Sequence, residues 1–109
     1  MGKAAVEELS RLRLQSRLGT NIHSSTSQNA PDYFDDVGRT YDQMGNPAMA
    51  PFWDEQRGQF YNQIQIHLRK ADFTVIDLTD FPANIRSDVG NHVLNLPQSQ
   101  FDKIIPIGF

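Results

Sequence analysis

The sequence contains no cysteine among its 109 residues. This absence excludes a disulfide framework, a thiol nucleophile, a cysteine zinc site, an iron–sulfur cluster and a zinc deaminase, whose signature requires a cysteine pair. The three histidines, His23, His67 and His92, do not form the HExxH pattern of zinc proteases. We therefore expect no metal and no other cofactor, with carboxylate-bound magnesium as the remaining metal alternative.

Long apolar segments are also missing. No run approaches the roughly 18–20 residues of a membrane span, and the first residues, MGKAAVEELSRLRLQ, lack the apolar core of a secretory signal. We therefore expect that the chain neither enters nor spans a membrane by itself. Its length suits one domain with one modest core.

Positive charge is scarce beyond the first twenty residues. The formal net charge is −3, and residues 21–109 hold six basic and eleven acidic side chains, whereas residues 1–20 hold four basic and two acidic ones. Binding to duplex nucleic acid through many phosphates normally needs a broad basic surface. Any contact with nucleic acid should therefore be local, or the acidic surface should serve another partner.

The N-terminal segment is predicted as a helix over 3–18, because its apolar residues follow a 3–4 spacing and a glycine ends it. The apolar stripe has only a few members, which are Ala5, Leu9 and Leu12. A stripe this thin is typical of a linker as well as of a core helix. We therefore divide the chain into residues 1–21, a linker or N-terminal helix, and residues 22–109, the domain proper.

Residues 20–51 show no clear regular structure. They are rich in Ser, Thr, Asn and Pro, and we expect one or two strands among them, with a short helix or strand around Tyr33–Tyr41. An irregular stretch of this length is unusual inside a compact domain unless it has a function. It is therefore the first place to look for site residues.

The second half of the chain has clearer patterns. Residues 53–70 and 82–95 carry apolar residues at helical spacing, and residues 72–78 and 103–107 are short β-branched runs. A strand, a helix and a strand within about 35 residues indicate a βαβ unit with parallel strands. The expected fold is α/β or α+β, a small single layer with a C-terminal βαβ unit flanked by helices.

Two segments of the irregular stretch carry reactive side chains. HSSTS at 23–27 places hydroxyls after His23, a group that can act as general acid or base while the hydroxyls of Ser25 and Thr26 donate to a phosphate or oxyanion. In DVGRTYDQMG at 36–45, Arg39 could clamp a phosphate and Tyr41 could stack on a base or donate a proton. Ordinary loop and core roles remain open for all of these residues.

Three further side chains lie on regular elements. His67 and His92 fall on the apolar faces of their predicted helices, where a histidine is a core residue or a site residue. Asp77 lies near the carboxyl end of a predicted strand, where open parallel sheets bind their ligands. A capping role at the following turn would explain Asp77 equally well.

Several stretches together resemble a known family. They are DFTVIDLTDF (72–81), LPQSQFDKIIPIGF (96–109), HSSTS, GRTYDQMG, Phe52-Trp53 and IQIHLRKAD (64–72). This combination is similar to the C-terminal toxin domains of bacterial polymorphic toxins of the contact-dependent growth inhibition and Rhs types. The resemblance covers residues 22–109 and leaves 1–21 outside.

The resemblance implies a domain that is delivered, as part of a larger toxin, into the cytoplasm of a competing bacterium and is neutralised in the producer by a cognate immunity protein. Toxins of this size are commonly metal-independent ribonucleases directed at tRNA or other RNA, and a host carrier protein could assist an acidic domain. The residues that supply the required chemistry are His23, His67, Tyr41 and Thr26 for catalysis, and Arg39, Ser25 and Asp42 for substrate binding.

Two alternatives remain. KADFTVIDLTDFPANIRSDVGNHV is also similar to the strand–helix core of nucleoside deoxyribosyltransferase-like and NAD-cleaving domains, in which Asp88 would be the nearest match to the acidic group at the ribosyl carbon. That family normally has Glu beside an aromatic residue, whereas this chain has Ser87-Asp88. The second alternative is a small acidic immunity or adaptor protein, which the net charge favours. A pocket around Asp77 and Asp88 would indicate the first, and a broad flat acidic face the second.

Overall fold

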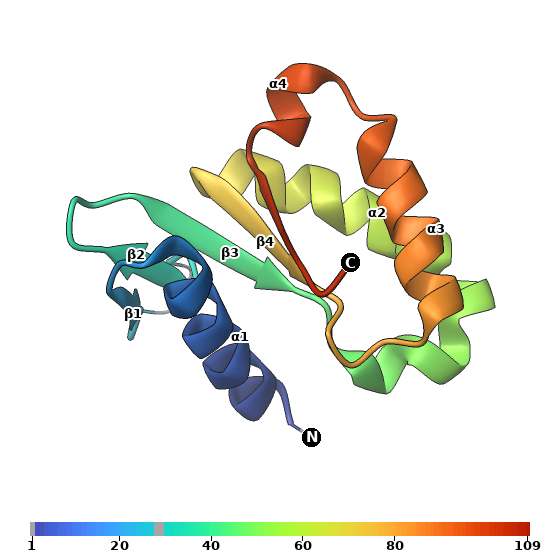
Figure 1. Ribbon diagram of the computed structural model, residues 1–109, viewed down its shortest axis with the longest axis horizontal. Helices are drawn as coiled ribbons and strands as arrows, with labels where there is room; N and C mark the ends of the chain where they lie inside the picture. The colour runs from blue at the N-terminus through green and yellow to red at the C-terminus, as the bar shows by residue number, and fades with distance from the viewer. Residues whose placement is uncertain (1, 28–29) are drawn as a thin grey trace.

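The computed structural model describes residues 2–27 and 30–109 and shows a five-stranded sheet with helices on both faces (Figure 1). Its elements in chain order are α1 (Lys3–Leu18), β1 (Ile22–Ser24), β2 (Tyr33–Asp35), β3 (Thr40–Met44), the 3-10 helix η1 (Pro47–Phe52), α2 (Trp53–Lys70), β4 (Phe73–Asp77), α3 (Ala83–Leu94), the short helix α4 (Gln98–Phe101) and β5 (Ile104–Ile107).

The strands lie side by side in chain order, β1-β2-β3-β4-β5. β1, β2 and β3 pair in antiparallel fashion, whereas β3, β4 and β5 are parallel. The predicted C-terminal βαβ unit is confirmed, since β4 and β5 are parallel and α3 connects them. α2 makes a second crossover of the same kind between β3 and β4. Because the sheet contains both parallel and antiparallel pairs, it is mixed, and the fold is α+β.

Each face of the sheet buries its own apolar cluster. α1 covers one face, where Leu14 packs with one residue from each of the five strands, namely Ile22, Tyr33, Tyr41, Val75 and Ile107. α2 and α3 cover the other face, and the buried residues there are Met44, Trp53, Phe60, Ile64, Leu68, Ile76, Leu78, Phe81, Ile85, Val89, Val93 and Ile104. The apolar residues predicted for these two helices form half of the second cluster.

The buried stripe of α1 differs from the predicted one. Val6, Ser10 and Leu14 face the sheet, whereas Leu12 is 47% exposed. The prediction of Ala5, Leu9 and Leu12 was wrong because a polar residue, Ser10, occupies the central buried position and donates a hydrogen bond to a strand carboxylate. α1 thus packs onto the sheet as a core element.

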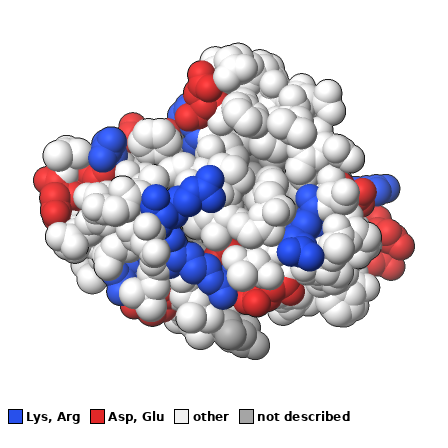
Figure 2. Space-filling view, in the orientation of Figure 1, with Lys and Arg blue, Asp and Glu red and all other residues white. Residues whose placement is uncertain are grey.

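Arginines on α1 tie the helix to the sheet. Arg11 donates to the Ile22 carbonyl of β1 (2.8 Å) and Arg17 to the Pro106 carbonyl of β5 (2.7 Å). Figure 2 shows basic side chains gathered over α1, in keeping with the surplus of positive charge in residues 1–20. In the described part of the chain no helix is apolar and long enough to cross a bilayer.

Residues 20–51 hold three strands, where one or two were expected. β1 and β2 have three residues each, and β3 (TYDQM) is rich in polar side chains that are nevertheless buried. Strands this short give no alternating pattern that a sequence can reveal. Their conformation depends on pairing with one another and on the helices above and below.

Candidate functional site

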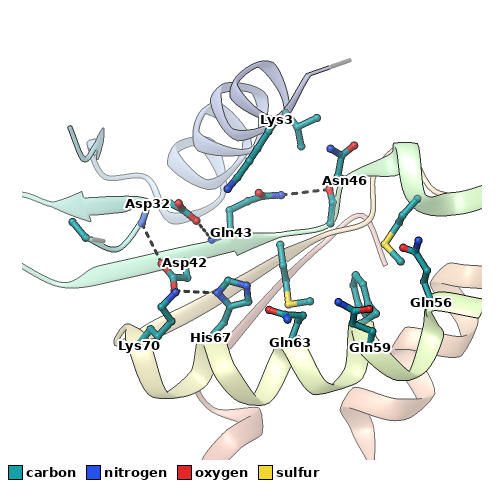
Figure 3. A pocket seen from close by; sticks show the side chains of 16 residues that line it. Lys3, Asp32, Asp42, Gln43, Asn46, Gln56, Gln59, Gln63, His67 and Lys70 are labelled. Carbon is teal, nitrogen blue, oxygen red and sulfur yellow. Dashed lines mark hydrogen bonds and ion pairs between the residues drawn. The ribbon is translucent and has the colours of Figure 1, made fainter. Parts of the chain in front are cut away.

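A pocket of about 390 Å³ lies along the free part of β3 (Figure 3). β2 pairs only with Thr40 and Tyr41, so the following residues of β3 have no strand on that side. The N-terminal turn of α1 lies above this edge and α2 lies below it. The charged and reactive side chains that line the pocket are Lys3, Asp32, Asp42, His67 and Lys70.

α2 supplies one wall of the pocket from a single helix face. Its lining polar residues, spaced three or four apart, are Gln56, Gln59, Gln63, His67 and Lys70. Residues at this spacing lie one above another on a helix. This row of glutamines was not predicted, although the periodicity of polar residues beside the apolar stripe would have revealed it.

His67 and Asp42 form the central pair of the pocket. The Nδ1 atom of His67 lies 3.1 Å from Oδ2 of Asp42, although the two residues are 25 positions apart. The other oxygen of Asp42 accepts from the amide of Asp32 (3.2 Å), and the carboxylate of Asp32 accepts from the amide of Gln43 (2.8 Å). Loop, strand and helix are thereby linked into one hydrogen-bonded chain.

This arrangement leaves the second ring nitrogen of His67 available. Within residues 2–27 and 30–109, Nε2 has no hydrogen-bond partner, and Figure 3 shows the ring directed from α2 toward the pocket. A carboxylate at Nδ1 favours the tautomer that carries its proton on Nδ1, which leaves a lone pair on Nε2. The ring is therefore set up to accept a proton from a group in the pocket.

The two pocket carboxylates differ in their electrostatics. Burial raises the pKa of Asp32, and the nearby charge of Asp42 raises it further. Burial also opposes ionisation of Asp42, but hydrogen bonds from His67 and from the Asp32 amide outweigh it, so the pKa of Asp42 lies below its ordinary value. Asp42 is thus the ionised partner of His67.

Asp32 and Asp42 are also the pocket residues with the chemistry to hold a divalent cation. Across the described part of the chain, however, no three His, Cys, Asp or Glu side chains converge in a way that could hold a metal ion. The ammonium groups of Lys3 and Lys70 supply the positive charge of the pocket instead. These two ammonium groups are the part of the lining suited to an anionic group such as a phosphate.

Three of the other predicted site residues contact carboxylates at the β2–β3 turn, outside the pocket. Nε2 of His23 lies 2.6 Å from the Asp36 carboxylate, and Nε of Arg39 donates to the Asp35 carboxylate (2.7 Å). The hydroxyl of Tyr41 also donates to Asp35 (2.8 Å). None of the three predicted residues lines the pocket.

Asp35 stabilises the β2–β3 turn by accepting several hydrogen bonds. Burial opposes its ionisation, but bonds from the Tyr41 hydroxyl and from the side chain and amide of Arg39 lower the pKa of Asp35 to about 2. Burial, together with the same carboxylate, raises the pKa of Tyr41 to about 12. Tyr41 lies beneath α1, in the first apolar cluster.

Ser25 and Thr26 of the hydroxyl-rich loop lie beside the pocket without lining it. The amide of Ser25 donates to the carbonyl of Asp32 (2.9 Å), which places this residue beside a pocket carboxylate. Thr26 is exposed in the same loop. Ala30, at the far end of the loop, contributes to the wall.

The carboxylates named for the glycohydrolase alternative are engaged elsewhere. Asp77 accepts hydrogen bonds from the hydroxyls of Ser10 (2.7 Å) and Thr79 (2.6 Å) and from Arg13 (2.9 Å). The pocket that touches it holds only about 10 Å³. Asp88 accepts from the indole nitrogen of Trp53 (3.0 Å) in the second apolar cluster.

Comparison with known proteins supplies one informative likeness. No protein-family model matches the sequence, and no curated protein matches it. Among solved structures, the chain is similar to the CdiA-CT toxin from Burkholderia pseudomallei E479, which was solved in complex with its cognate CdiI immunity protein. The TM-score is 0.81 at 23% sequence identity, over 93% of this chain and 97% of that chain. The chain therefore has the fold of a CdiA-CT toxin domain, as the resemblance in its sequence implied.

Proposed function

We propose that the chain is an interbacterial toxin domain that cleaves tRNA or other RNA in target cells without a metal ion. The observation that carries this proposal is the His67–Asp42 pair, placed in a pocket that also contains two ammonium groups. The shared fold with a toxin supports the biological role. By the same likeness, the domain is delivered as part of a larger protein and is neutralised by a cognate immunity protein.

The reaction begins at the ribose 2′-hydroxyl. Nε2 of His67 removes the hydroxyl proton while Asp42 stabilises the imidazolium that forms. The 2′-oxygen bonds to the adjacent phosphorus, the bond from phosphorus to the 5′-oxygen breaks, and the 5′-oxygen takes a proton from water. The hydroxide that remains takes the proton from the His67 imidazolium, which restores the neutral base. The products are a 2′,3′-cyclic phosphate and a 5′-hydroxyl end.

The remaining pocket residues bind the substrate. Lys3 and Lys70 neutralise the phosphate, and the glutamine row of α2 offers neutral donors and acceptors to bases and sugars. Local contacts of this kind agree with the small number of basic residues outside the N-terminal helix. A host carrier protein is a possible second source of RNA affinity for a domain with this charge.

In this proposal the other candidate residues contact the RNA, stabilise the β2–β3 turn or position His67. Ser25 and Thr26 lie in the loop beside Asp32, where their hydroxyls can reach RNA that extends out of the pocket. Tyr41 and Arg39 hold the β2–β3 turn through Asp35. Asp42 acts on His67 and is therefore a positioning residue, which differs from the substrate-binding role predicted for it.

The test is cleavage of purified tRNA and total bacterial RNA in EDTA, with NAD consumption measured in parallel. We expect discrete RNA fragments from the wild type and a loss of at least about a hundredfold in rate for His67→Ala. His92→Ala is the matched control, since His92 stacks on Tyr61 (3.8 Å between centroids), outside the pocket.

Three outcomes would contradict the proposal. Cleavage that requires added Mg²⁺ would overturn the metal-free mechanism and indicate a cation at Asp32 and Asp42. Intact RNA with consumed NAD would favour the glycohydrolase alternative. If both substrates survive in the presence of a cell extract that supplies carriers, the enzyme proposal fails and a binding protein is favoured.

A further inference from the structure

The exposed end of the sheet carries an aromatic pair that the proposed mechanism does not use. His23 of β1 and Phe34 of β2 are register partners, and their ring centroids lie 5.2 Å apart. Phe34 is 41% exposed, and the side chain of His23 is 44% exposed. Two neighbouring rings are thus presented to solvent on adjacent strands.

Both rings lie on the sheet face of the catalytic pair. Ile22 and Tyr33 point into the cluster beneath α1, and successive residues of a strand point to opposite faces. His23 and Phe34 therefore point to the α2 face, toward which Asp42 also points. Figure 1 shows β1 and β2 at the left of the sheet, away from α2 and α3, so neither of these helices covers this part of the face.

The rings are also close to the pocket along the strands. Phe34 is paired with Thr40, which lies two residues before Asp42 on the same face of β3. Two strand residues span about 7 Å. Asp32 likewise lies two residues before Phe34, and it lines the pocket. Phe34 therefore lies one row of side chains from Asp42, and His23 lies beside Phe34 on the next strand.

We propose that His23 and Phe34 form a stacking platform for an unpaired base of the RNA, adjacent to the scissile phosphate. The inference rests on the proposed ribonuclease function and adds that the substrate is unstacked at the cleavage site. Stacking on aromatic rings binds single-stranded RNA with little dependence on charge, which suits a chain of net negative charge. The Asp36 carboxylate, 2.6 Å from Nε2, fixes the orientation of the His23 ring.

The experiment measures RNA binding by the full chain in an inactive His67→Ala background. Fluorescence anisotropy is recorded with a short labelled single-stranded RNA and with a duplex of the same length, at one fixed salt concentration. Phe34→Leu should weaken single-strand binding by roughly 5- to 150-fold, the range for loss of one base–aromatic stack, and should leave duplex binding unchanged. Phe34→Trp should retain most of the single-strand affinity.

The matched control is Phe109→Leu, because Phe109 is 44% exposed and lies in a different pocket, beside α3. This variant should bind both RNAs as the background protein does. At the second ring, His23→Asn should weaken single-strand binding, and His23→Phe, which keeps a ring but cannot transfer a proton, should restore it.

The outcomes separate this inference from the function on which it rests. Unchanged single-strand binding by Phe34→Leu, with wild-type RNA cleavage intact, overturns the platform alone. Loss of cleavage in His23→Phe also overturns it, since a proton-transfer role would then be indicated. Loss of immunity-protein binding in Phe34→Leu, with RNA binding retained, would assign the rings to a protein partner. No cleavage by the wild type overturns the ribonuclease function itself.

Discussion

Replacing Asp42 with Asn tests the link between the fold and the catalytic pair. Asp42 is 3% exposed, and Asn has nearly the same volume, so the strand should keep its packing. An Asn side chain can still accept from the Asp32 amide through its oxygen. Its amide group, however, presents N–H to Nδ1 of His67 where the carboxylate presented an acceptor.

The expected consequence is a change of tautomer at His67. The ring would place its proton on Nε2, and the base that faces the pocket would be lost. A hydrogen bond to a charged group contributes about 1.5–3 kcal/mol, which corresponds to a roughly 10- to 150-fold lower kcat. KM should change much less, because the proposed phosphate contacts of Lys3 and Lys70 do not involve Asp42.

The assay is steady-state cleavage of a fluorogenic RNA, with thermal unfolding measured on the same samples. Asp88→Asn is the matched control, since its partly exposed carboxylate accepts from Trp53 outside the pocket and should leave kcat unchanged. A kcat for Asp42→Asn within twofold of the wild type would refute the reasoning. An equal loss in Asp88→Asn would show that the effect comes from general destabilisation.

Three further predictions concern stability. Gly45→Ala should lower the free energy of unfolding by more than about 2 kcal/mol, because φ is 111° and the new Cβ would lie 2.3 Å from a β4 carbonyl oxygen. In the same urea titration, Gly58→Ala should raise the free energy of unfolding slightly, since the new Cβ in α2 meets nothing within 4 Å. Leu14→Ala should lower the free energy of unfolding by about 2–5 kcal/mol, since Leu14 is fully buried, whereas Leu12→Ala should change it little. Equal effects of the two substitutions would contradict the packing of α1 on the sheet. The folded pKa of Asp35, about 2, lies below its ordinary value of 3.8, so its stabilising effect is present above pH 4 and is lost as the pH falls toward 2. The difference in free energy of unfolding between the wild type and Asp35→Asn should become smaller over that range. A constant difference would contradict the lowered pKa of Asp35.

The C-terminal half of the fold was predictable because its signals are local. Helix periodicity placed Phe60, Ile64 and Leu68 in the core, and β-branched residues marked β4. β3 was not predictable in this way, since its buried Asp42 and Gln43 look like loop residues. Their burial is stabilised by partners from α2 and the preceding loop, which no local pattern contains.

The candidate site was predictable as single residues but not as a pair. Both His67 and Asp42 are recognisable in the sequence as candidate site residues, yet their contact depends on the packing of α2 against the edge of β3 after a parallel crossover. Asp32 was overlooked because it follows a loop rich in Ser, Asn and Pro. His23 and Tyr41 were grouped with His67 by chemistry alone, and the fold directs their polar atoms to the carboxylates of the β2–β3 turn, outside the pocket.

The most direct test of the central claim is an analysis of the RNA ends that the purified wild-type domain produces in EDTA. Attack by the 2′-hydroxyl under control of His67 predicts a 2′,3′-cyclic phosphate on one fragment and a 5′-hydroxyl on the other. The cyclic phosphate is identified by its resistance to ligation, and the 5′-hydroxyl is identified by direct labelling with polynucleotide kinase, without prior phosphatase treatment. A 5′-phosphate that forms only with added Mg²⁺ would contradict the account, because water activated by a metal would then be the nucleophile.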